Sequence, residues 1–241
     1  MKKKIRAVKS GTKTKIRLNI KVGYAGAAAG EISGDAAISC GLPDGSRALI
    51  LSDGMGRGIK AAAGSRLVVS RLRKNLKEGM PVARAIKEVN RYMIGCADDE
   101  DFATVDLTII DPKLCRAKFY KMGAGASFLV RDGRVRRITQ EALPVGIVPR
   151  LRLTHISAKL RPGDIIVAAS DGITEADRND MEACWLREFL SNYVETCHIS
   201  PRRLAADILQ QALVRYDGKE QDDLTVAVVV LNNEEQDFTD C

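Results

Sequence analysis

The stretch ALILSDG (residues 48–54) decides the fold, because four apolar residues run through Ser52 directly into the carboxylate of Asp53. The same arrangement returns in IIVAASDG (residues 165–172), which ends on Asp171 and Gly172. A third acidic pair, Asp222-Asp223, stands directly before the apolar run 224–231. Carboxylates at the ends of buried strands are unfavourable unless a cation neutralises them. The pattern therefore indicates a divalent-metal site built from strand ends that lie far apart in the sequence.

A tight turn is the alternative interpretation of these Asp-Gly pairs. Asp-Gly is the strongest short hairpin signal, since glycine accepts a positive φ. The first residues of the pairs are Asp44, Asp53, Asp132, Asp171 and Asp217. Three of the pairs lie among polar residues, where a turn explains them. Those at Asp53 and Asp171 follow apolar runs, which favours metal ligation there over a turn.

Length and composition indicate an ordinary globular domain. The 241 residues suit one large domain or two small ones, and 45% hydrophobic with 29% charged residues is typical of globular proteins. No apolar run approaches the roughly 18 residues that a membrane span needs. The first residues, MKKK, lead into more charge, which is not the pattern of a signal peptide. We expect a cytoplasmic protein, or the soluble part of a membrane-attached one.

The net charge of +7 is a feature of the N-terminus. Nine of the 38 Lys and Arg residues lie within residues 1–21, which hold no acid, so the remaining 29 are outnumbered by 31 Asp and Glu. A nucleic-acid interface needs basic residues clustered on a folded face. We therefore expect no nucleic-acid partner, although a DNA-binding module remains a rival interpretation. The expected organisation is a basic tail or linker over 1–14, one domain over 15–232 and a C-terminal tail over 233–241.

The cysteines predict neither a zinc site nor a disulfide framework. The six, Cys40, Cys96, Cys115, Cys184, Cys197 and Cys241, include no Cys-x-x-Cys pair. Thiols in a reducing compartment explain them.

The order of elements predicts the fold class. Strands are expected near 15–26, 35–41, 47–53, 102–110, 114–122, 126–131, 134–138, 151–158, 164–170 and 224–231, with helices near 58–77, 81–97, 182–195 and 201–215. Neighbouring strands follow one another as hairpins, and helices enter in pairs, so this is not a βαβ alternation. We expect an α+β fold of two packed antiparallel sheets with helix pairs on their outer faces.

Six motifs occur in the order found in metal-dependent serine/threonine protein phosphatases (the PPM family). They are ISGD (32–35), LSDGMG (51–56), FAT (102–104), LPVG (143–146), ASDG (169–172) and DDLT (222–225). The chain resembles above all the bacterial branch typified by the phosphatase domain of stage II sporulation protein E, from about residue 20 to 231. This resemblance implies an α-β-β-α sandwich, in agreement with the order of elements.

The resemblance also implies a site for two Mn²⁺ or Mg²⁺ ions. Asp53 would bridge both ions, and Gly54 would offer its backbone carbonyl to one of them. Asp171 and Asp222 would complete the protein ligands of the second ion, and Asp35 would bind directly or through water. Hard divalent cations prefer such oxygen ligands, and a pair of them can activate water for attack on a phosphoryl group. Asp53 and Asp171 are therefore the candidate catalytic residues.

The sequence departs from the wider family at two functional positions. Eukaryotic members have a histidine, proposed as general acid, where this chain has Met55, and the basic residues before Asp35 offer no convincing match to their phosphate-binding arginine. The proton donor and the phosphate clamp therefore stay unassigned. The acidic run 98–101 lies where some relatives bind a third metal, but a charged loop is favoured there. The glycine-rich segment 123–127 is favoured as a tight turn, because it lacks the Lys-Ser/Thr of a P-loop.

The expected function is hydrolysis of phosphoserine or phosphothreonine on a regulatory protein. The resemblance implies a small anti-anti-sigma factor as substrate, in a partner-switching or sporulation pathway. A metal-dependent phosphodiesterase and a non-catalytic partner-binding scaffold are the alternatives. Whether the protein forms a homodimer is left open.

Overall fold

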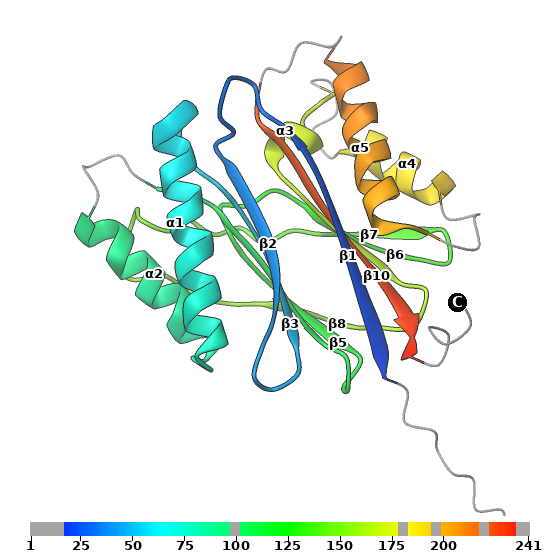
Figure 1. Cartoon of the computed structure of the whole chain (residues 1–241), viewed down its shortest axis with the longest axis horizontal. Helices are drawn as coiled ribbons and strands as arrows, with labels where there is room; N and C mark the ends of the chain where they lie inside the picture. Colours follow the sequence, from blue (N-terminus) through cyan, green and yellow to red (C-terminus); the bar gives the residue numbers. More distant parts are fainter. Residues whose placement is uncertain (1–16, 97–101, 178–182, 194–198, 217–221, 235–241) are drawn as a thin grey trace, which may run out of the picture.

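The computed structural model describes residues 17–96, 102–177, 183–193, 199–216 and 222–234 (Figure 1). Its strands are β1 (Leu18–Ala27), β2 (Asp35–Gly41), β3 (Arg47–Asp53), β4 (Val105–Asp111), β5 (Arg116–Met122), β6 (Ser127–Arg131), β7 (Arg134–Ile138), β8 (Ile156–Lys159), β9 (Ile165–Ala169) and β10 (Leu224–Asn233). Its helices are α1 (Gly58–Lys77), α2 (Val82–Cys96), α3 (Asp171–Thr174), α4 (Cys184–Tyr193) and α5 (Pro201–Arg215). The expected tail over 1–14 and the acidic run 98–101 lie outside the described residues.

The strands form two antiparallel sheets. Sheet A has the order β1-β10-β9-β6-β7, and sheet B has the order β2-β3-β4-β5-β8. In sheet A, β1 pairs with β10 along its whole length, from Leu18 opposite Asn233 to Ala27 opposite Leu224. In sheet B, β2 and β3 form a hairpin whose register places Asp35 opposite Asp53. The hairpin therefore brings two acidic residues together at one end of sheet B.

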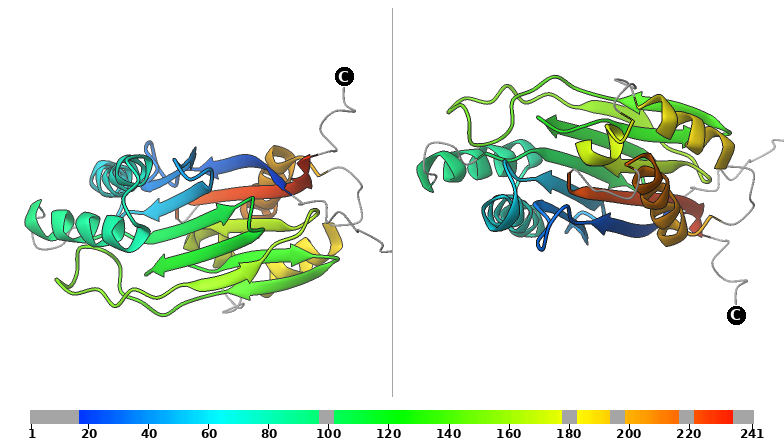
Figure 2. Two further views of the ribbon diagram at one scale, coloured as in Figure 1. Left: turned by 90° about the horizontal axis from the view of Figure 1, so that it is seen from below. Right: turned by 90° about the horizontal axis from the view of Figure 1, so that it is seen from above.

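Three apolar clusters define the layers. One lies between the sheets and contains Leu49, Phe119, Ile166 and Val229 among others. A second joins the outer face of sheet B to α1 and α2, and a third joins the outer face of sheet A to α3, α4 and α5. Figures 1 and 2 show α1 and α2 at one side of the molecule and α4 and α5 at the other. The predicted α-β-β-α sandwich is thus confirmed.

The close approach of α5 to sheet A requires a glycine. A Cβ on Gly23 of β1 would lie 2.3 Å from the backbone nitrogen of Arg202. The helix begins at Pro201, and its N-terminus is capped by Ser200, whose hydroxyl accepts from the backbone N–H of Arg203 (3.4 Å). The first turn of α5 therefore packs directly on the backbone of β1.

A buried ion pair within sheet B is linked to sheet A by a serine hydroxyl. Lys121 Nζ on β5 lies 2.7 Å from Asp106 Oδ2 on β4, and both side chains are fully buried. Ser127, the first residue of β6 in sheet A, donates to the same carboxylate oxygen (2.7 Å), and Lys121 also donates to the carbonyl of Gly125 (2.6 Å). Removing one member would leave the other charge buried and unpaired, which is strongly destabilising. This network fixes the segment between β5 and β6 beneath the acidic end of the sandwich.

Two elements differ from the sequence prediction. The strand expected over 151–158 is the shorter β8, which pairs with only four residues of β5. Residues 151–155 leave the sheet edge because Leu151 and Leu153 pack into the cluster beneath α1 and α2. The short helix α3 was not predicted, since its four residues are too few to show a helical period. Among the described residues, no helix is both long and apolar enough to cross a membrane.

Candidate metal centre

The end of β3 supplies Asp53 and is held by the FAT motif. Thr104 Oγ1 accepts from the backbone N–H of Asp53 (2.8 Å), and the Thr104 N–H donates to the Asp53 carbonyl (2.8 Å). The hydroxyl of Ser52 donates to the Thr104 carbonyl (2.6 Å). Ala103 then pairs with Val145 of the LPVG motif through two backbone bonds of 3.1 and 3.0 Å. These two motifs therefore position the backbone that carries Asp53.

Gly54 lies so close to the backbone of α1 that no residue with a side chain fits at this position. A Cβ at this position would lie 1.9 Å from the carbonyl oxygen of Ala61 in the first turn of α1. The Gly54 N–H donates to the carbonyl of Gly34, just before β2 (3.2 Å). The sequence favoured glycine here for access to a metal ion. The structure adds a second reason, which is the contact with α1.

Sheet A supplies the other acidic residues. Asp171 opens α3 and is separated from β9 only by Ser170, and its Oδ1 accepts from the N–H of Gly172 (2.8 Å). Asp222 is separated from β10 only by Asp223, and its Oδ1 accepts from the N–H of Asp223 (2.9 Å). The two strands are fastened through Ser170, whose hydroxyl accepts from the N–H of Thr225 (2.9 Å). The carboxylates of Asp171 and Asp222 therefore lie at the same end of the sheet.

Asp223 is a positioning residue that the sequence analysis did not assign. Its carboxylate accepts from the backbone N–H groups of Ala29 (2.8 Å) and Gly34 (2.6 Å). Those bonds tie the start of β10 to the segment that leads into β2. The adjacent acidic pair was visible in the sequence, but which carboxylate turns inward depends on a partner nearly 200 residues away. Asp222 is exposed at the site, and Asp223 is buried behind it.

Burial and mutual repulsion raise the pKa values of the clustered carboxyl groups. The pKa of Asp53 rises to about 8, through burial and then through the charges of Asp171, Asp35 and Asp222. The pKa of Asp35 rises to about 7, chiefly through burial. Burial also raises the pKa values of Asp171 and Glu175. The next largest cause is the charge of Asp222 for the pKa of Asp171, and the charge of Asp171 for the pKa of Glu175. The four expected acidic ligands therefore form one electrostatic cluster that spans both sheets.

The residues present suit a divalent cation. Both carboxylate oxygens of Asp35 are buried, with no hydrogen-bond partner among the described residues. A buried carboxylate without partners is strongly unfavourable, and a cation removes that penalty. In the described part of the chain, no three acidic, Cys or His side chains gather tightly enough to form a ready-made metal-binding group.

A small hollow of about 390 Å³ adjoins the cluster. It lies between the segment before β2 and the N-terminus of α1, and Glu31, Arg57, Ile59 and Asp223 are among its lining residues. Arg57 is the cationic side chain in this lining. Sequence reasoning sought a phosphate-binding arginine before Asp35 and did not consider one after Asp53. Only the packing of α1 against the segment before β2 brings Arg57 and Asp223 into the lining of one hollow.

The raised pKa values predict how stability depends on pH. In the unfolded chain an Asp has an ordinary pKa of 3.8, so between about pH 4 and 8 the folded, metal-free protein holds protons that the unfolded chain has lost. The free energy of unfolding should therefore fall as the pH rises through this window. With EDTA, we expect the melting temperature to fall between pH 5 and 8, and saturating Mn²⁺ to restore it at pH 8. Thermal melts with and without metal measure this.

The Asp53→Asn variant is the control for that effect. It removes the carboxyl group whose pKa is raised more than that of Asp35, so its metal-free melting temperature should change less over the same pH range. Identical pH profiles for the wild-type protein and this variant would contradict the cluster.

Comparison with known proteins agrees with this fold. The family model for stage II sporulation protein E (SpoIIE) matches residues 43–232. Stage II sporulation protein E of Bacillus subtilis (strain 168) is 29% identical over 224 residues, covering 92% of this chain and 27% of that protein. The same protein of Priestia megaterium is 29% identical over 213 residues, covering 88% of this chain and 36% of that protein. The chain therefore spans about a quarter to a third of these curated relatives.

Solved structures show the same architecture. The structure of the PP2C phosphatase domain with a fragment of the regulatory domain of SpoIIE from Bacillus subtilis has a TM-score of 0.82 at 29% identity, over 91% of this chain and 65% of that one. The RsbU and RsbW domains of Rv1364c from Mycobacterium tuberculosis share the fold, with a TM-score of 0.79 at 21% identity, over 90% and 63% of the two chains. The fold and family place this chain in the class of PP2C-type serine/threonine phosphatase domains. Within that class, it belongs to the stage II sporulation protein E family.

Proposed function

We propose that this chain is a metal-dependent phosphatase that hydrolyses phosphoserine or phosphothreonine on a regulatory protein. The observation that carries the proposal is the cluster of Asp35, Asp53, Asp171 and Asp222, which comes from both sheets and raises the pKa of Asp53 to about 8. Two Mn²⁺ or Mg²⁺ ions bound there would activate water and neutralise the phosphoryl oxygens. The presence of every expected acidic ligand argues against a non-catalytic scaffold.

The protein's own residues have distinct roles in this proposal. Asp53 and Asp171 would hold the metal ions from opposite sheets, and the carbonyl of Gly54, next to Asp53, would be a further ligand. We call the site of these residues the reacting centre. Thr104 fixes the backbone of Asp53, and Asp223 fixes the segment before Asp35. Met55 is 54% exposed and has no ionisable proton, so residue 55 does not act as the general acid. In this proposal, catalysis depends on positioning the metal ions and the attacking water, and no covalent intermediate with the protein is formed.

A small phosphorylated anti-anti-sigma factor is the proposed substrate, in a cytoplasmic partner-switching or sporulation pathway. Support comes from the relatives' names, which include a sporulation protein, and from the solved structure that joins RsbU and RsbW domains in one protein. No part of this proposal requires nucleic acid or a membrane. A homodimer would be compatible with it.

Phosphate release from a phosphorylated anti-anti-sigma factor tests the proposal. We expect release with Mn²⁺, loss of release with EDTA, and a loss of at least about 100-fold in the Asp171→Asn variant, because removing one charged ligand weakens charge stabilisation by several kcal/mol. Bis-(p-nitrophenyl) phosphate, a diester, serves as the comparison substrate. Faster hydrolysis of the diester than of the phosphoprotein would identify a phosphodiesterase instead.

A further inference from the structure

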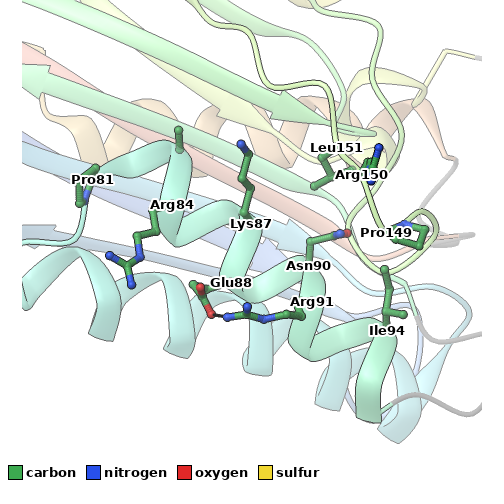
Figure 3. Close-up of a pocket in the computed structure, with 11 residues that line it drawn as sticks. Pro81, Arg84, Lys87, Glu88, Asn90, Arg91, Ile94, Pro149, Arg150 and Leu151 are labelled. Carbon is green, nitrogen blue, oxygen red and sulfur yellow. Dashed lines mark hydrogen bonds and ion pairs between the residues drawn. The ribbon is translucent and has the colours of Figure 1, made fainter.

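A hollow of about 940 Å³ lies between α2 and the segment before β8, outside the acidic cluster (Figure 3). Its lining residues come from Pro81 and α2 on one side and from Pro149, Arg150 and Leu151 on the other. Figure 3 shows Asn90 and Ile94 reaching from α2 toward the segment 149–151. We call this hollow the α2 groove. Its volume is within the range of ligand-binding sites.

The α2 groove carries an excess of positive charge. Among the described residues, its lining includes Arg84, Lys87, Arg91 and Arg150 but a single acid, Glu88, which forms an ion pair with Arg91. Within the described ranges, Arg84, Lys87 and Arg150 have no acidic partner, and all three side chains are exposed. A concave surface lined by one sign of charge attracts ligands of the opposite sign. The ligand of this groove should therefore be acidic.

Apolar side chains share the lining and restrict the class of ligand. Pro81, Ile94, Pro149 and Leu151 lie among the cations, and Ile94 is 36% exposed. In the part of the chain that the structure describes, no aromatic side chain lines the groove, whereas single-stranded nucleic acid binds by stacking its bases on aromatic rings. A lipid surface would not fill a concave site. A protein segment with alternating acidic and aliphatic side chains would match both the cations and the apolar side chains of the lining.

The groove connects to the acidic cluster through Asn90. This side chain is 2% exposed, and its amide donates to the carbonyl of Val148 (2.9 Å) and accepts from the N–H of Gly146 (2.9 Å). Gly146 belongs to the LPVG motif, which pairs with Ala103 beside the Thr104 contact with Asp53. One wall of the groove is thus built on the same backbone that positions the reacting centre.

We propose that the α2 groove binds an acidic segment of the phosphoprotein substrate while its phosphorylated residue lies at the metal centre. This inference rests on the proposed function, because it names a second contact with the same substrate. Remote contacts of this kind strengthen binding of the protein substrate and leave a small aryl phosphate unaffected. The groove would then select among phosphoproteins by the charge of a segment outside the phosphorylation site.

Charge reversal in the groove tests the proposal. In the variant Arg84→Glu/Lys87→Glu/Arg150→Glu, the KM for a phosphorylated anti-anti-sigma factor should rise at least tenfold relative to the KM for p-nitrophenyl phosphate, with kcat for the phosphoprotein little changed. The neutral variant Arg84→Gln/Lys87→Gln/Arg150→Gln should show a smaller rise in the same direction. For the wild-type protein, the phosphoprotein KM should also increase with salt, because the attraction is screened.

A matched variant controls for total charge. Arg134→Glu/Arg136→Glu/Arg137→Glu makes the same change in net charge on β7, at the edge of sheet A, and should leave the ratio of the two KM values as in the wild-type protein. If the wild-type protein dephosphorylates the substrate but both groove variants keep the wild-type ratio of the two KM values, the docking site is refuted and the proposed substrate is not. A wild-type protein that releases no phosphate from the phosphoprotein overturns the proposed substrate and this inference together.

Discussion

Replacing Asp53 by Asn should lower phosphatase turnover by about 1,000-fold or more, because several kcal/mol of charge stabilisation depend on this carboxylate. Asn has nearly the same shape but no charge, so the fold should persist. Without metal the variant should be at least as stable as the wild-type protein, since it relieves repulsion from Asp35, Asp171 and Asp222. Initial rates on p-nitrophenyl phosphate with Mn²⁺, together with thermal melts in EDTA, measure both effects.

Asp132→Asn is the matched control for that change. Asp132 also precedes a glycine, but it lies in the exposed hairpin between β6 and β7 with φ at 49°, a conformation that Asn tolerates. Its turnover and stability should remain near those of the wild-type protein. Equal turnover in the Asp53 and Asp132 variants would refute the role of Asp53.

Replacing Gly54 by Ala should cause the second large effect. Its Cβ would meet the backbone carbonyl of Ala61 at 1.9 Å, and no change of rotamer relieves a contact with backbone. Either α1 or the segment after Asp53 has to move, at a cost of about 1–3 kcal/mol or more in the free energy of unfolding. We expect turnover to fall at least about 100-fold as well, since the reacting centre depends on sub-ångström placement. Urea unfolding and Mn²⁺-dependent rates measure the two losses.

Gly64→Ala separates that contact from the general effect of adding a methyl group. Gly64 lies inside α1, and a Cβ there meets nothing within 4 Å. Alanine is a better helix former, so this variant should be more stable by about 0.5–1 kcal/mol and fully active. If Gly54→Ala behaved like Gly64→Ala, the proposed contact between α1 and the centre would be wrong.

The sequence predicted the elements that rest on strong local patterns. The apolar runs before Asp53 and Asp171 are nearly continuous, and they form the buried strands β3 and β9. Asp53 is the last residue of β3, and Asp171 follows β9 after Ser170. The alternation of short strands and turns was enough to predict two antiparallel sheets. The motif order then indicated the family and the sandwich.

Other features depend on contacts between distant segments, which local patterns do not contain. The role of Asp223 follows from its bonds to Ala29 and Gly34, and the role of Thr104 follows from its pairing with Asp53. The shortening of β8 follows from the packing of Leu151 and Leu153 beneath the helices. The sequence could suggest that the acidic residues meet, but not which backbone holds them there.

Counting bound Mn²⁺ ions tests the central claim most directly, because the claim is that carboxylates from both sheets form one divalent-metal site. Isothermal titration calorimetry of the metal-free protein with Mn²⁺ at pH 7.5 gives the number of ions bound per chain. We expect two ions for the wild-type protein and the Asp132→Asn variant, and at most one for Asp53→Asn. Absence of Mn²⁺ binding by the wild-type protein, or the same two ions bound with equal affinity by Asp53→Asn, would contradict the account.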